Sequence, residues 1–239
     1  MDFELPDAVL WDMDGTLVDT EKLWEIALAE LAGRLGGTLS AETRAAIVGS
    51  NSRRTMRLLF DDLGLELTDD AYAEANAWLE ARMHELFAGD VPWRPGAEEA
   101  LRMVRETGLP TALVTSTVRP LAERALDHIG RHWFDTTVAG DEVGGLNKPH
   151  PRPYLRAAEL LGVAPSRCVA IEDSPVGSAA AQAAGCGVIV VPNDVPVEPG
   201  PSMLMLETLV GLRPRHLGDA FALVRRTREG DGDRACRTA

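Results

Sequence analysis

Residues 8–16 read AVLWDMDGT, and this stretch decides the fold. Its first four residues are apolar, and they are followed closely by Asp12, Asp14 and Gly15. A short apolar run that stops at acids and a glycine is typical of a buried strand that leads into a loop. Strands that are apolar at every position are covered on both faces, which is the pattern of parallel sheets. We therefore predict a parallel strand at 8–11, with two carboxylates directly after it.

The same pattern returns along the chain, with helical segments between the apolar runs. Further strands are expected at 111–114, 136–139, 168–171 and 188–191. Helices are expected at 96–107, 120–129, 153–161 and 175–184, each with a proline near its start and a glycine at its end. This alternation predicts the α/β class, with a doubly wound, mainly parallel, Rossmann-like sheet.

The stretch from 21 to 91 interrupts the alternation, because it contains no convincing strand. Helices are expected there at 23–35, 41–48, 53–63 and 69–88, the last with Thr68 as its N-cap. The sequence thus predicts an all-helical unit at 21–91, inserted into an α/β core that is formed by 1–20 and 92–224. The last segment, 225–239, is polar and rich in glycine, and we predict that it is disordered.

The composition is that of an ordinary globular protein. Among the 239 residues, 45% are hydrophobic and 26% are charged, which excludes a disordered chain, a collagen and a bare coiled coil. A formal net charge of −13 disfavours nucleic acid as a partner. With neither a long apolar run nor a signal peptide in the sequence, no membrane partner is expected. Three cysteines without a CxxC pair are typical of a reducing compartment, and the predicted location is cytoplasmic.

Four polar features stand near the ends of the expected strands. They are Asp12 to Thr16, Thr115 to Thr117, Lys148 with Pro149, and Glu172 to Ser174. Parallel strands place their carboxyl ends on one edge of a sheet, where α/β proteins bind ligands, so these features should meet. Crowded carboxylates repel each other unless a cation joins them, and an all-oxygen cluster suits Mg²⁺. Together with a lysine and hydroxyl groups, such a site favours phosphoryl transfer, in which an Asp can be the covalent acceptor.

These motifs resemble those of the haloacid dehalogenase superfamily, in its phosphatase and phosphomutase branch with a helical cap. The four family motifs occur in order, as DMDGT at 12–16, VTST at 114–117, KPHPRPY at 148–154 and IEDS at 171–174. The resemblance covers nearly the whole chain. It implies that the helical unit is a cap, which closes over the site, excludes bulk water and contacts the rest of the substrate.

The resemblance also implies a role for each motif residue. Asp12 would be the nucleophile that forms an aspartyl-phosphate, and Asp14 would be the general acid and then the general base. Thr115 and Lys148 would be catalytic through their contacts with the transferring phosphoryl group. The ligands of Mg²⁺ would be Asp12, Asp14 through its carbonyl group, Glu172 and Asp173. Substrate or phosphate binding is expected of Gly15, Thr16, Ser116, Thr117, Arg53 and Arg119.

The predicted function is a Mg²⁺-dependent phosphatase, a phosphoric monoester hydrolase that acts on a sugar phosphate or a similar metabolite. The alternative is a sugar phosphomutase of the β-phosphoglucomutase type, which is disfavoured because such enzymes usually have a His where this chain has Trp24. A phosphonatase needs a lysine in the cap, and Lys22 keeps that possibility open. A receiver domain that is phosphorylated on Asp is disfavoured, because receivers are shorter and lack a helical cap.

The cap loop at 49–54 is the expected specificity element, and either Arg53 or Arg54 would contact the distal part of the substrate. His128 and His132 have helical spacing that suits zinc, but no third ligand is evident. The expected partner is a small phosphorylated molecule, and the chain is expected to be a monomer or a weak homodimer.

Overall fold

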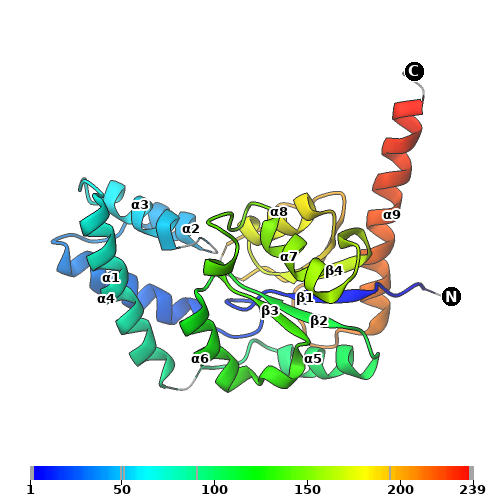
Figure 1. Cartoon of the computed structure of the whole chain (residues 1–239), viewed down its shortest axis with the longest axis horizontal. Helices are drawn as coiled ribbons and strands as arrows, with labels where there is room; N and C mark the ends of the chain where they lie inside the picture. Colours follow the sequence, from blue (N-terminus) through cyan, green and yellow to red (C-terminus); the bar gives the residue numbers. More distant parts are fainter. Residues whose placement is uncertain (1–2, 49, 51, 90, 194, 237–239) are drawn as a thin grey trace.

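The centre of the molecule is a six-stranded sheet in the order β3-β2-β1-β4-β5-β6, in which every neighbouring pair is parallel (Figure 1). The computed structural model describes residues 3–48, 50, 52–89, 91–193 and 195–236. The strands are β1 Ala8–Trp11, β2 Thr111–Val114, β3 Thr136–Val138, β4 Cys168–Glu172, β5 Gly187–Val190 and β6 Met203–Met205. The α/β prediction is confirmed. Strand β6 is not predicted from the sequence, because its three residues are only half-buried and too few to form a pattern.

Alternate residues of each strand pack against helices on opposite faces of the sheet. The surrounding helices are α5 Ala97–Glu106, α6 Arg119–Ile129, α7 Arg152–Leu161, α8 Pro175–Ala184 and α9 Pro214–Cys236. Val9 and Trp11 of β1 lie in the core formed with α5, α6 and α9. Ala8 and Leu10 lie in the core formed with α7 and α8. Because all four side chains are fully buried, the strand is apolar at every position.

The described residues between β1 and α5 form helices that lie to one side of the sheet (Figure 1). They are α1 Glu21–Arg34, α2 Ala41–Ile47, α3 Ser52–Asp62 and α4 Asp69–Phe87. Helix α1 packs against α4, and α4 also contacts α6 of the core. Buried residues of these helices, such as Leu31, Met56 and Met83, belong to the same hydrophobic core as Val9 and Trp11. The domain boundaries predicted near residues 20 and 91 stay predictions.

The chain enters and leaves these helices through two segments that are hydrogen-bonded to each other. The Asp19 amide donates to the Pro92 carbonyl group (2.8 Å), and the Arg94 amide donates to the Leu17 carbonyl group (2.8 Å). Both segments lie just beyond the carboxyl end of β1. This attachment places α1 to α4 beside the edge of the sheet where the polar motifs are found.

The helix starts follow the capping rules. The Thr68 side chain accepts a hydrogen bond from the Ala71 amide (3.2 Å), and two aspartates occupy the first turn of α4. At the start of α8, the Ser174 hydroxyl accepts from the Gly177 amide (3.1 Å), and Pro175 takes the first helical position. This second cap fixes the loop that carries Glu172 and its neighbours.

The end of the chain differs from its prediction. Disorder is predicted from residue 225, whereas helix α9 continues to Cys236. Leu217, Phe221 and Val224 are buried in the first part of this helix, so packing provides the nucleus from which the helix propagates. Residues 237–239 of the predicted tail lie outside the described residues. Among the described residues, no helix has both the length and the apolar composition that a membrane span requires.

Candidate active site

The DMDGT motif forms a tight turn directly after β1. The Leu17 amide donates back to the Met13 carbonyl group (2.9 Å), and Gly15 has a positive φ of 81°. That conformation favours glycine because it has no Cβ atom, which explains the Gly in the motif. The turn leaves Asp12 at the end of the strand and directs the Asp14 side chain toward the cavity described below.

Lys148 is the buried centre of the site. Its Nζ atom donates to Asp12 Oδ1 (2.6 Å), to Glu172 Oε1 (2.7 Å) and to the Val114 carbonyl group (2.9 Å). The side chain is only 2% exposed, and the two carboxylates hold the pKa of Lys148 above its usual range despite the opposing effect of burial. One ammonium group therefore connects the ends of β1, β2 and β4, as predicted from the strand-end positions of these motifs.

Three buried carboxylates gather around this lysine. Oxygen atoms of Asp12, Glu172 and Asp173 lie within 4.8 Å of one another. Burial, together with the nearby negative charge of Glu172, raises the pKa of Asp12 to about 7. The excess of carboxylates over ammonium groups, with oxygen donors only, fits a divalent cation such as Mg²⁺. A metal site formed by these three side chains is thus compatible with the geometry.

Asp14 lies apart from the three acids and is held by hydroxyl and indole groups. Its Oδ2 atom accepts from the hydroxyls of Thr115 (3.1 Å) and Thr117 (2.8 Å), which follow β2. Its Oδ1 atom accepts from Thr20 Oγ1 (2.6 Å) and from Trp24 Nε1 (3.3 Å), at the start of α1. The Asp14 carboxylate therefore receives hydrogen bonds from both the sheet side and the helical side of the molecule. It is not part of the carboxylate cluster, so its predicted contribution to the metal site rests on the carbonyl group alone.

The remaining motif residues are close to these groups. Thr16 Oγ1 donates to Asp12 Oδ2 (2.9 Å) and lies 3.4 Å from Asp173 Oδ1. Ser116 lines the cavity beside Thr117. The structure thus brings together the predicted core residues Asp12, Asp14, Gly15, Thr16, Thr115, Ser116, Thr117, Lys148, Glu172 and Asp173. The roles assigned to them stay predictions.

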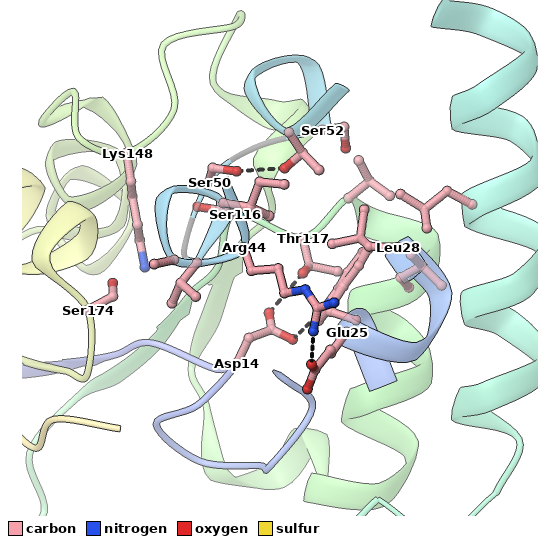
Figure 2. Close-up of a pocket in the computed structure, with 18 of the residues that line it drawn as sticks. Asp14, Glu25, Leu28, Arg44, Ser50, Ser52, Ser116, Thr117, Lys148 and Ser174 are labelled. Carbon is pink, nitrogen blue, oxygen red and sulfur yellow. Dashed lines mark hydrogen bonds and ion pairs between the residues drawn. The ribbon is translucent and has the colours of Figure 1, made fainter. Parts of the chain in front are cut away.

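A cavity of about 320 Å³ lies between this edge of the sheet and the helices α1 to α4 (Figure 2). The core contributes Asp12, Asp14, Ser116, Thr117, Lys148, Asp173 and Ser174 to its wall. The helical side contributes apolar residues, among them Leu28 and Leu79, and polar residues that include Glu25 and Arg44. A volume near the lower end of the usual range suits a small ligand.

Two predicted substrate-binding residues lie elsewhere. Arg53 is exposed, 3.4 Å from Asp69 and above the ring of Tyr72, so it does not line the cavity. Arg119 donates to Glu142 (2.5 Å) and to Thr137, which ties the start of α6 to the segment around β3. The structure therefore does not support substrate contacts by these two arginines. Gly49 and Asn51 of the predicted specificity loop lie outside the described residues.

Other residues of the site are not singled out by the sequence. The hydroxyl of Tyr154 donates to Glu172, and Lys148 Nζ lies 5.2 Å from the centroid of its ring. Position 177 requires glycine, because a Cβ atom there would lie 2.0 Å from the Glu172 carboxylate oxygens. Tyr154 is the last residue of the KPHPRPY motif, and this position was the available signal. For Gly177, only the three-dimensional approach of the α8 backbone to Glu172 gives the reason.

The site consists of carboxylates, a buried lysine and hydroxyl groups at the carboxyl ends of parallel strands, and helices lie over it. This combination defines an α/β enzyme suited to phosphoryl transfer. Comparison with known proteins gives the family. Residues 6–185 match the haloacid dehalogenase-like hydrolases, so the chain belongs to that family. The predicted class, a phosphoric monoester hydrolase, is confirmed by relatives that are named as phosphatases.

Two curated relatives illustrate the match. The phosphorylated carbohydrates phosphatase of Thermotoga maritima is 34% identical over 200 residues, which is 79% of this chain and 88% of the relative. Hexitol phosphatase B of Escherichia coli (strain K12) is 32% identical over 199 residues, covering 77% and 83% of the two chains. A crystal structure of β-phosphoglucomutase from Clostridium difficile superimposes with a TM-score of 0.83 over 91% of this chain and 98% of that one. Its sequence identity of 20% means that this likeness concerns the fold alone.

Proposed function

We propose that the chain is a Mg²⁺-dependent phosphatase that hydrolyses a sugar phosphate, or a similar phosphomonoester, through an aspartyl-phosphate on Asp12. The observation that carries this proposal is the pair of carboxylates in the DMDGT turn. Asp12 contacts Lys148 and the acid cluster, whereas Asp14 stands apart from them and lines the same cavity. The two carboxylates thus occupy different environments, which suits two different chemical roles.

In the first step, an oxygen of the Asp12 carboxylate attacks phosphorus, and the bond to the alcohol oxygen of the substrate breaks. Asp14 then donates the proton that the departing alcohol needs, which requires its protonated form at that moment. Lys148 Nζ, already 2.6 Å from Asp12 Oδ1, neutralises negative charge on the nucleophile and on the phosphoryl oxygens. Ser116, which lines the cavity, would bind a further phosphoryl oxygen, and Thr115 would do so by turning its hydroxyl away from Asp14.

Asp12, Glu172 and Asp173, with the Asp14 carbonyl group, would hold the metal. When bound, Mg²⁺ would supply positive charge that offsets the repulsion between the carboxylates and the anionic substrate. Thr16 fixes the Asp12 carboxylate through a 2.9 Å hydrogen bond, and Tyr154 does the same for Glu172. Such supporting contacts hold the ligand atoms in place before the cation arrives.

In the second step, Asp14 accepts a proton from water, which attacks the phosphorus of the aspartyl-phosphate and releases phosphate from Asp12. A phosphomutase must instead return the phosphoryl group to a sugar. At the position where mutases of this branch usually have His, Trp24 donates its indole N–H to Asp14. Because an indole does not exchange a proton near neutral pH, Trp24 favours hydrolysis over the mutase reaction.

Release of inorganic phosphate from a panel of sugar phosphates and polyol phosphates tests this proposal. The assay is run with Mg²⁺ and with EDTA, for the unchanged protein and for Asp12→Asn. Activity that requires both Mg²⁺ and Asp12 is expected, with Arg53→Gln as a matched control that keeps its activity because Arg53 is outside the cavity. Phosphate release by Asp12→Asn at an undiminished rate would overturn the aspartyl-phosphate route.

A further inference from the structure

The wall of the cavity formed by the helices α1, α2 and α4 carries polar groups from all three. Glu25 of α1 and Arg44 of α2 form an ion pair at 2.8 Å, which is drawn as a dashed line in Figure 2. Across the cavity wall, Asn76 Nδ2 donates to Glu80 Oε1 (2.8 Å) on α4. Asn76 and Glu80 are half-buried, and they stand beside the buried Leu79. Polar side chains on a largely apolar wall are the usual means by which a pocket orients its ligand.

The charges on this helical wall are unfavourable for a second anionic group. Glu25 and Glu80 provide two carboxylates, and Arg44 provides one guanidinium that is already paired with Glu25. Lys148, the other basic residue of the described lining, is engaged with Asp12 and Glu172. A phosphate group placed beside Glu25 and Glu80 would be repelled by both and would find no cation without a carboxylate partner among the described lining residues.

The same groups suit neutral hydroxyls. A sugar or polyol hydroxyl can donate to a carboxylate oxygen of Glu25 or Glu80 and accept from the amide of Asn76 or the guanidinium of Arg44. Hydrogen bonds that involve an ionised partner are stronger than neutral ones. Leu28 lies on the same wall, where the C–H groups of a carbon chain can pack. The mixture of donors, acceptors and apolar surface thus matches a polyhydroxylated carbon chain.

We infer that this enzyme selects substrates with a single phosphoryl group and an uncharged, hydroxylated remainder, and that Glu25 and Glu80 discriminate against a second phosphoryl group. The inference rests on the proposed function, since it assigns the reacting phosphoryl group to the Asp12 end of the cavity. It narrows the substrate class from sugar phosphates in general to monophosphorylated sugars or polyols.

A matched pair of compounds tests it. The value of kcat/KM is measured with Mg²⁺ for fructose 1-phosphate and for fructose 1,6-bisphosphate, with p-nitrophenyl phosphate as a reporter of the chemical step. We expect the monophosphate to be preferred by about 10-fold, because the half-buried Glu80 opposes the bisphosphate and solvent weakens the repulsion from the exposed Glu25. Equal or better use of the bisphosphate would overturn the inference. Hydrolysis of none of the three compounds would instead count against the proposed function.

A binding measurement distinguishes the inferred substrate preference from the proposed phosphatase function. Calorimetric titration of Asp12→Asn with both compounds measures the same preference without turnover, so it decides the inference even if the chemistry differs from the proposal. In Glu25→Gln/Glu80→Gln, the ratio of the two affinities is expected to fall to near one, and a ratio within one protein is independent of its active fraction. Glu30→Gln is the matched control, because Glu30 pairs with Arg82 outside the cavity and should leave the ratio unchanged. An unchanged ratio in the double variant would refute the role of these carboxylates.

Discussion

Replacement of Lys148 by methionine tests the charge balance at the centre of the site. The Lys148 ammonium makes hydrogen bonds of 2.6 to 2.9 Å to Asp12, Glu172 and the Val114 carbonyl group, and its side chain is 2% exposed. Methionine retains an unbranched side chain of similar volume but has neither the charge nor the donors. The variant therefore leaves Asp12 and Glu172 buried beside each other without their cation.

The expected loss of stability is large. Removal of one partner from a buried ion pair typically costs about 3–5 kcal/mol, and we expect the free energy of unfolding in EDTA at pH 8 to fall by about that amount. At pH 5.5 the loss should be smaller. The folded-state pKa of Asp12 is already about 7, above its unfolded value, and it rises further without the ammonium. The stability that protonated Asp12 contributes is present at low pH and is lost as the pH rises through the folded-state pKa. Each further unit by which the substitution raises this pKa adds about 1.4 kcal/mol to the loss at high pH.

Urea denaturation in EDTA at pH 5.5 and pH 8 measures both losses. Lys22→Met is the matched control, because Lys22 is the other lysine of the chain and its ion pair with Asp19 is at the surface. We expect the control to change stability by less than about 0.5 kcal/mol at either pH. If Lys148→Met loses the same free energy at both pH values, the effect is one of packing, and the electrostatic reasoning is refuted.

Three further predictions follow from the same contacts. Tyr154→Phe removes the hydroxyl that donates to Glu172, and we expect Mg²⁺ affinity, measured by calorimetry, to fall about 10-fold with the fold intact; unchanged affinity would contradict this. Gly177→Ala places a methyl group 2.0 Å from the Glu172 carboxylate and should destabilise by about 1–3 kcal/mol in urea. Gly33→Ala is its control, since a Cβ atom there has no neighbour within 4 Å and should not destabilise the helix. Mg²⁺ should raise the melting temperature more at pH 8 than at pH 5.5, because a proton competes for Asp12; equal gains would exclude Asp12 as a ligand.

The parallel sheet and the residues at its edge could be predicted because both follow from short-range pattern. An all-apolar run such as 8–11 requires cover on both faces, and parallel strands end on one edge. Asp12 and Lys148, 136 positions apart in sequence, are therefore placed together by strand ends alone, and the structure joins them at 2.6 Å. Strand β6 has only three, half-buried residues, and the part of α9 beyond Val224 is polar, so neither segment has the apolar pattern from which the other elements are predicted.

The cavity wall formed by α1, α2 and α4 could not be predicted in the same way. A helical unit shows which residues are apolar, but the rotation of each helix decides which polar residue faces the cavity. Arg44 and Arg53 are both arginines on short helices, α2 and α3, and only Arg44 lines the cavity, where it pairs with Glu25 from a different helix. Arg119 is likewise used within the core, where Glu142 and Thr137 accept its hydrogen bonds. Side-chain contacts between helices that are distant in sequence therefore cannot be predicted from the sequence pattern of either helix.

The small number of basic residues that line the cavity connects the proposed metal site with the proposed substrate preference. When Asp12, Glu172 and Asp173 are ionised, their three negative charges face the single positive charge of Lys148. Under the proposed function, Lys148 alone would not offset the negative charges of these carboxylates and of the phosphoryl group, so we expect a divalent cation to assist substrate binding as well as catalysis. Near Glu25 and Glu80 the described residues form no such cation site, and Arg44 is matched by Glu25. On the proposed function and the inference drawn from it, an excess of carboxylates accounts both for a metal beside Asp12 and for discrimination against a second phosphoryl group.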